Sequence, residues 1–144
     1  MSDGGRSPEF SASLALFGDA LEPTEVSRLL RCEPDESYRA GDRISSRSGG
    51  VRKNGSWSIN DHLSPTDSLS TKLEDVLSRV TVDSDIRRAL TGQVEASLFC
   101  GIFLNNPEKL GELVSLPATL LKRAADLGLE LVLDIWPPPA TGER

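Results

Sequence analysis

The feature that most constrains the fold is a long alternation of side chains from Gln93 to Leu104. Its two sides are Val94, Ala96, Leu98, Cys100, Ile102 and Leu104, against Gln93, Glu95, Ser97, Phe99, Gly101 and Phe103. A period of two residues is that of a β-strand, because successive side chains point to opposite faces of a sheet. The alternation recurs in Glu9–Phe17 and Leu129–Trp136. The sequence therefore predicts a sheet whose faces differ in polarity.

Helical spacing dominates the segments between these strands. Pro23 suits the first turn of a helix, where its missing N–H is not needed. A second helix is expected to start at Ser64 or Thr66, either of which suits its N-cap. The apolar stripe of that helix is formed by Leu69, Leu73, Val76, Leu77 and Val80. Shorter helices are expected at 84–90 and 115–127.

The order of these elements predicts an α+β fold. We expect a two-layer sandwich in which helices pack on one face of a mostly antiparallel sheet of about four strands. Residues 9–136 are expected to form a single domain, since a chain of 144 residues falls within the usual domain size. Residues 1–8 and 137–144 are rich in glycine, serine and proline and are expected to be flexible tails.

A long polar run, Cys32–Ile59, interrupts the pattern. Asn54-Gly55 favours a type I′ turn, so we expect a long β-hairpin-like excursion at 38–60. The whole chain carries a formal net charge of −6, yet Arg39–Lys53 holds five cations and one anion. The candidate binding residues of this excursion are Tyr38, Arg39, Arg43, Arg47, Arg52, Lys53 and Trp57.

Two interpretations of the excursion remain open. Arginine makes bidentate contacts with carboxylates and phosphates and stacks on aromatic rings, so the excursion suits an anion or a protein partner. Alternatively, it is a solvated hairpin whose cations pair with the acidic remainder of the chain. Trp57 would then be the anchor of the hairpin in the core.

The second face of the sheet is a competing candidate surface. It is less polar than a fully solvated face, because Phe17, Phe99, Phe103, Val132 and Trp136 are all predicted to point to it. Half-exposed aromatic residues are also common on ordinary protein surfaces. The candidate interface residues are Phe99, Phe103, Asp134 and Trp136.

Several classes of chemistry find no support in the sequence. His62 is the single histidine and no nucleophile, phosphate-loop or metalloprotease motif surrounds it, so we assign no catalytic residue. Two cysteines cannot complete a zinc site, and we expect no metal and no cofactor. The acidic balance argues against nucleic acid as the main ligand. No apolar run is long enough to span a membrane and no signal peptide is recognisable, so we expect a cytoplasmic protein.

The residues that punctuate these elements resemble those of a known family. Pro34, Ser37, Arg39 and Gly41, then Gly55–Trp57, the strand LFCGIFL and the closing LGLELVLDIW are similar to the small bacterial family called domain of unknown function 4279. The resemblance covers about residues 9–136 and departs at Trp136, where tyrosine is expected. It implies a bacterial origin and a small stand-alone protein, and it implies no established activity.

The function expected from the sequence is protein binding without catalysis. Small families of this kind often include immunity proteins, and an acidic body suits a basic toxin, so an immunity-type or regulatory module is the first hypothesis. The second is a small-anion or nucleotide-binding protein that uses Arg39, Arg43 and Trp57. The third is a homo-oligomerising structural protein, such as a homodimer, that associates through Phe99, Phe103 and Trp136 on the second face. Enzymatic activity stays undecided and is the less favoured outcome.

Overall fold

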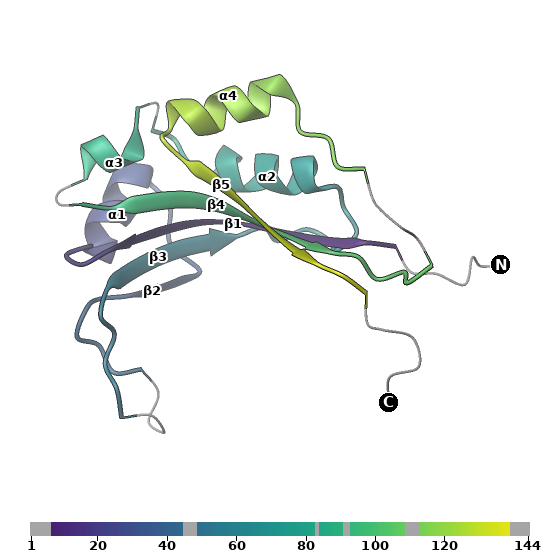
Figure 1. Ribbon diagram of the computed structural model, residues 1–144. Helices are drawn as coiled ribbons and strands as arrows, with labels where there is room; N and C mark the ends of the chain where they lie inside the picture. Colours follow the sequence, from purple (N-terminus) through teal and green to yellow (C-terminus); the bar gives the residue numbers. More distant parts are fainter. Residues whose placement is uncertain (1–6, 45–48, 83, 91–92, 109–112, 139–144) are drawn as a thin grey trace.

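The computed structural model describes residues 7–44, 49–82, 84–90, 93–108 and 113–138. Its helices and strands are β1 (Glu9–Gly18), α1 (Pro23–Leu30), β2 (Glu36–Tyr38), β3 (Gly55–Asn60), α2 (Leu69–Ser78), α3 (Ile86–Ala89), β4 (Glu95–Phe103), α4 (Ala118–Asp126) and β5 (Glu130–Trp136). The strands form one sheet in the order β2-β3-β1-β4-β5 (Figure 1). The predicted tails lie largely outside the described residues.

The α+β class is confirmed, and the sheet differs in detail from the expected one. It has five strands and is mixed, because β4 and β5 run parallel while the other neighbouring strands are antiparallel. The additional strand, β2, is only three residues long, too short to show an alternating pattern. The parallel pair arises because α4 connects β4 to β5 and returns the chain to the start of its neighbour.

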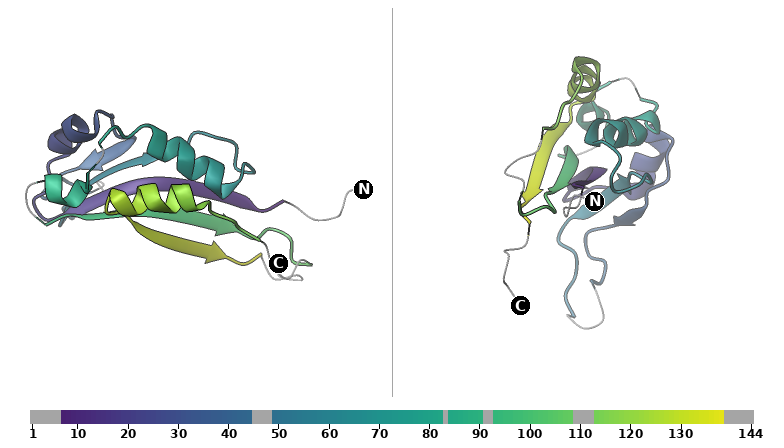
Figure 2. Two further views of the ribbon diagram at one scale, coloured as in Figure 1. Left: turned by 90° about the horizontal axis from the view of Figure 1, so that it is seen from above. Right: turned by 90° about the vertical axis from the view of Figure 1, so that its right-hand side faces the viewer.

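Within the described residues, the helices lie on one side of the sheet (Figures 1 and 2). Buried residues of both layers form the hydrophobic core between them. The sheet contributes Ala12, Leu14, Leu16, Trp57, Ile59, Ala96, Leu98, Cys100 and Ile102 to this core. The helices contribute Val26, Leu30, Leu69, Leu73, Val76, Leu77, Ile86, Leu120 and Ala124. The predicted alternation is therefore confirmed, since the more apolar side of each long strand faces the helices.

Trp57 is the largest side chain in this core. It lies opposite Leu16 in the β1–β3 register and has no solvent-exposed surface. Its Nε1 donates a hydrogen bond of 3.0 Å to Ser27 Oγ on α1. A buried indole N–H needs such an acceptor, because an unpaired donor in the core is costly. Trp57 therefore fixes β3 against α1.

A buried ion pair fixes α2 to the sheet. Lys72 Nζ lies 2.8 Å from Asp61 Oδ1, and the two side chains are only 2% and 6% exposed. Asp61 also accepts hydrogen bonds from the main-chain N–H groups of Ala12 and Leu63. Burial by itself would raise the pKa of Asp61, but the hydrogen bonds from Lys72, Ala12 and Leu63 together hold that pKa below its ordinary value.

The start of α2 corrects the predicted cap. Neither Ser64 nor Thr66 caps this helix; Ser68 does, with its Oγ accepting a hydrogen bond from the main-chain N–H of Thr71. Residues 64–67 instead form a turn closed by a hydrogen bond from Asp67 N to Ser64 O. The carbonyl of Pro65 accepts a hydrogen bond from Phe10 N, so this segment serves β1 and is not available to the helix.

The predicted type I′ turn at Asn54-Gly55 is also wrong. That turn needs positive φ at both residues, and neither has it. Gly55 is instead the first residue of β3, opposite Gly18. A Cβ atom built on Gly55 would lie 2.5 Å from the carbonyl oxygen of Leu21, so this glycine is required by close packing of the backbone.

A second charged contact lies at the C-terminal end of α2, at its C-cap residue Arg79. Arg79 donates hydrogen bonds to the carboxylate of Asp75 and to the main-chain carbonyl of Asn60, at 2.8 and 2.7 Å. The hydrogen bond from Arg79 is the main reason that the pKa of Asp75 lies below its ordinary value. The main-chain N–H of His62 also donates to Asp75 at 3.4 Å. These contacts hold the end of β3 and the loop after it against α2.

We predict that the buried Asp61–Lys72 ion pair matters much more for the free energy of unfolding than an exposed ion pair with the same N–O distance. Asp61→Ala strands a buried ammonium group and two main-chain N–H groups, so the free energy of unfolding should fall by about 3–5 kcal/mol. Lys72→Met leaves Asp61 with its two main-chain donors and should cost less. Chemical denaturation followed by circular dichroism measures both effects.

Lys122→Met provides the matched control for this prediction. Its ion pair with Asp126 has the same 2.8 Å distance, but the two side chains are 75% and 55% exposed. An exposed pair contributes less than about 1 kcal/mol. Equal destabilisation by Lys72→Met and Lys122→Met would contradict the role given to burial.

The lowered pKa of Asp75 predicts how stability depends on pH. An unfolded chain has the ordinary Asp pKa of about 3.9, so protons bind more tightly to the unfolded state. The stabilisation is therefore fully present above that value and is lost as the pH falls through the lower folded value. The stability difference between the wild type and Asp75→Asn should be largest near neutral pH and shrink in acid. In an Arg79→Met background, the same comparison should lose most of its pH dependence.

Candidate functional site

The face of the sheet without helices, called the open face below, carries four aromatic side chains, of which Trp136 is exposed and the other three are partly exposed. Phe17 and Phe99 meet edge to face, with ring centroids 6.3 Å apart and ring planes at 86°. Phe103 and Trp136 are direct neighbours in the β4–β5 register, and Trp136 is 53% exposed. All four aromatic residues lie on the side predicted from the sequence. Small residues, including Ser11, Ser13, Ala15 and Gly101, separate them.

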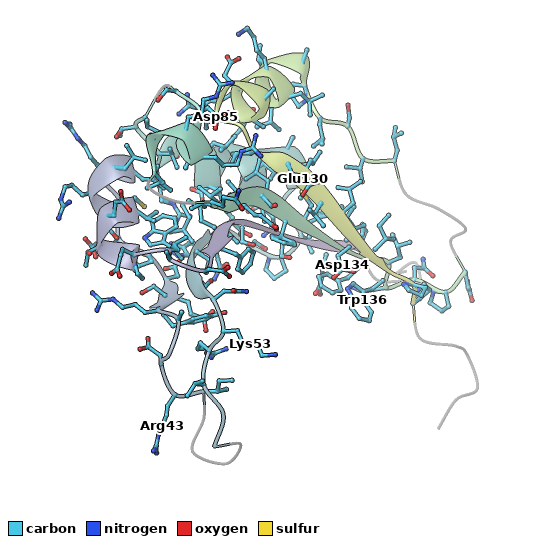
Figure 3. All side chains as sticks on the ribbon, turned by 60° about the vertical axis from the view of Figure 1, so that its left-hand side comes forward. Arg43, Lys53, Asp85, Glu130, Asp134 and Trp136 are labelled. Carbon is cyan, nitrogen blue, oxygen red and sulfur yellow. The ribbon has the colours of Figure 1, made fainter. Side chains whose placement is uncertain are left out.

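The charged side chains that the strands themselves place on the open face have a single sign. Every charged side chain that the strands place there is a carboxylate: Glu9, Glu36, Glu95, Glu130 and Asp134. The remaining strand positions on this face are aromatic, small or uncharged. Figure 3 shows Asp134 and Trp136 side by side along β5, on the side away from α4. The surface therefore combines apolar anchors with a field that attracts cations.

The described parts of the excursion, residues 39–44 and 49–54, lie below the sheet on the side of the open face (Figure 1). Its arms pair through hydrogen bonds from Gly41 N to Arg52 O and from Arg52 N to Asp42 O, at 2.8 and 2.7 Å. Farther along, Ile44 N donates to Gly50 O at 3.0 Å. The described arms of the excursion predicted for 38–60 therefore pair as a hairpin would, and its residues 45–48 lie outside the described residues.

Most of the residues predicted to bind a ligand on the excursion make different contacts and do not converge on one site. Arg52 lies 4.0 Å from the centroid of the Tyr38 ring, a cation–π contact. Arg39 pairs with Glu22 of the N-cap of α1 at 3.0 Å. Arg43 points away from the body of the protein, and Lys53 lies near the base of the excursion (Figure 3).

The remaining predicted residues fall into different environments. Arg47 lies outside the described residues. Trp57 is completely buried, so it has no surface to offer a ligand and belongs to the core. The excursion leaves the sheet from the β2–β3 edge, whereas Asp134 and Trp136 lie on β5 at the opposite edge. The two surfaces proposed from the sequence are therefore distinct.

A hollow of about 690 Å³ opens at the end of the sheet beside the open face. It is lined by Phe17, Gly18, Asp19, Asn54, Asp85, Arg87, Arg88, Gln93, Val94 and Glu95. The sequence analysis missed this site, because its residues come from four separate segments of the chain. The adjacent pair Arg87-Arg88 was its one visible signal. The lining holds three carboxylates and two guanidinium groups, so its charges largely compensate each other and specify no single ligand.

The histidine and the two cysteines lie outside the open face. His62 Nε2 lies 3.3 Å from Asp35 Oδ1, but its side chain is 64% exposed. Burial raises the pKa of Cys32, and it raises the pKa of Cys100 to about 11, so both thiols stay protonated near neutral pH. Among the described residues, no group of three or more His, Cys, Asp or Glu side chains is placed to hold a metal ion.

None of the helices in the described part of the chain is long and apolar enough to cross a membrane. No curated protein and no solved structure shows a significant match to the chain. A comparison with protein families, in contrast, matches residues 8–138 to the family described as domain of unknown function (DUF4279). Because that match spans nearly the whole chain and includes every strand of the sheet, the chain belongs to the DUF4279 family.

Proposed function

We propose that this chain is a non-enzymatic protein-binding module, of immunity or regulatory type, that holds a basic partner protein on its open face. One observation carries the proposal: the strands place aromatic residues and five carboxylates on that face, and no cation. Binding surfaces are enriched in exposed aromatic residues, which supply apolar contact area at a low cost in side-chain entropy.

The arrangement assigns different roles to the two kinds of residue. Trp136 and Phe103, adjacent at one end of the face, supply the apolar anchor. The carboxylates attract a basic surface during the approach and select against acidic proteins. Because these carboxylates lie on four different strands, they are spread over the face and match an extended basic surface better than a single small cation.

The alternative of a small-anion or nucleotide site has less support. Of the residues named for it, Trp57 is buried, Arg39 is engaged with Glu22, and Arg43 lies out along the excursion. The carboxylates of the open face repel an anion that approaches from that side. Among the described residues, Arg52 is the one guanidinium group stacked against an aromatic ring, and a single such pair is a common surface contact.

The proposal predicts that charge reversal on the open face removes the partner. Tagged wild-type protein, Glu95→Lys and Glu130→Lys would be purified from the native host at low salt, and the bound proteins quantified by mass spectrometry. A basic protein should be recovered with the wild type and lost with both variants. Trp136→Ala should weaken recovery at all salt concentrations, because it removes apolar contact area and leaves the charge unchanged.

Glu74→Lys is the charge-matched control for this experiment, because Glu74 is exposed on α2 in the helical layer. It makes the same change in net charge on the opposite side of the molecule and should retain the partner. Recovery of the same proteins by all variants, or loss of the partner with Glu74→Lys as well, would contradict a site on the open face. If the partner is a toxin, co-expression of wild-type protein should protect growth and co-expression of Glu95→Lys should not.

A further inference from the structure

Strand β5 is an edge of the sheet with an unused row of main-chain groups. Leu104 N donates to Trp136 O, so the carbonyl of Trp136 points toward β4. Main-chain groups of successive strand residues point to opposite sides, so those of Leu131, Leu133 and Ile135 point away from the sheet. No hydrogen bond to another element engages these three residues within the described part of the chain.

The side chains of β5 are more exposed than an alternating strand should leave them. Leu133 and Ile135, on the helix side, are 50% and 56% exposed, and Trp136 is 53% exposed. Figure 2 shows α4 above the first part of β5, while the end of the strand extends past the helix. The two charged residues of the strand, Glu130 and Asp134, both point to the open face, and the strand contains no lysine, arginine, proline or glycine. Natural edge strands usually carry such residues, because they prevent pairing with another strand.

We propose that two copies of this chain form a homodimer by antiparallel pairing of their β5 strands, in a register centred on Leu133. In that register Leu133 lies opposite Leu133 of the second copy, and Leu131 lies opposite Ile135 in both halves. All three are pairs of outward-pointing residues, so each exchanges two hydrogen bonds, which makes six across the seam. The same pairs place apolar side chains against each other on the helix side of the sheet.

The neighbouring registers are poorer for reasons of charge and of hydrogen bonding. A register centred on Val132 sets Glu130 opposite Asp134 of the second copy, and like charges in direct opposition are destabilising. It also needs the main-chain N–H of Leu129, which already donates to Ala124 O. A register centred on Asp134 sets the two Asp134 side chains against each other and sets Leu131 opposite Pro137, which has no N–H.

The register centred on Leu133 also fits the uneven cover of β5. A two-fold axis perpendicular to the sheet keeps the helices of both copies on one side and the open faces on the other. Because the strands run antiparallel, α4 of one copy lies at the end where Ile135 of the other copy is uncovered. Leu121, 44% exposed on α4, is an apolar residue available to this second contact. The result is one continuous sheet, and it does not depend on the partner proposed for the open face.

The oligomeric state of the full chain tests the inference. Light scattering coupled to size-exclusion chromatography should give the mass of a dimer for the wild type. Leu133→Lys should give a monomer with an unchanged circular dichroism spectrum, because this side chain is half exposed in a single copy. A wild type that is monomeric at every concentration, or a Leu133→Lys variant that remains a dimer, would overturn the proposal.

Disulfide trapping tests the register in a Cys32→Ser background, in which the remaining Cys100 is fully buried. Under oxidation Leu133→Cys should form a covalent dimer, because opposed residues of a hydrogen-bonded pair lie about 5.5 Å apart at Cα, within disulfide range. Ile135→Cys, on the same side of the same strand, should not, because its own copy lies four positions away along the seam. Cross-linking by Ile135→Cys without cross-linking by Leu133→Cys would show the register to be wrong.

Discussion

The carboxylate of Asp61 is the contact on which the two-layer arrangement depends. It accepts hydrogen bonds from the main chain of β1, from the loop after β3 and from the ammonium group of Lys72 on α2. These partners lie 49, 2 and 11 residues away in sequence, so one buried group joins three segments of the chain. Hydrophobic burial is not directional and would not by itself fix the positions of these segments relative to one another. A buried charge is tolerated only when its partners are all in place, and this requirement fixes where α2 lies on the sheet.

Fixing the helices on one side determines what the other side can be. With apolar residues of β1, β3 and β4 used beneath the helices, the opposite positions of the same strands have no helical layer to pack against. Those positions hold serine, alanine and glycine near the middle of the open face, with aromatic residues and carboxylates around them. In an alternating strand, one set of side chains faces the core and serves folding, whereas the second set faces the other side and can serve the surface. The carboxylates that the strands place on the open face belong to the second set.

Much of the fold could be predicted because the strongest patterns are local. The alternation of Gln93–Leu104 gave the correct faces of β4, and the apolar stripe after Leu69 gave α2. What failed depended on distant partners. Gly55 looked like a turn residue, but it is a strand residue required by the backbone of Leu21, which no local pattern reveals. Likewise Ser64 looked like a cap, but the neighbouring Pro65 carbonyl is occupied by Phe10 of β1.

The candidate sites show the same limit. Aromatic residues of the open face could be assigned by parity, whereas its uniform charge emerges only once the strands are ordered and Glu9, Glu95 and Glu130 fall on one surface. The apolar alternation of β5 resembles that of a strand with two neighbours, but the β4–α4–β5 crossover leaves it with one. The residues whose main-chain groups face outward are those whose side chains lie on the helix side. A second copy at this edge would therefore pair the outward main-chain groups and cover the exposed apolar side chains of β5 at the same time. The open face of each copy would stay uncovered and continuous with that of the other. Self-association and partner binding therefore need not compete for surface.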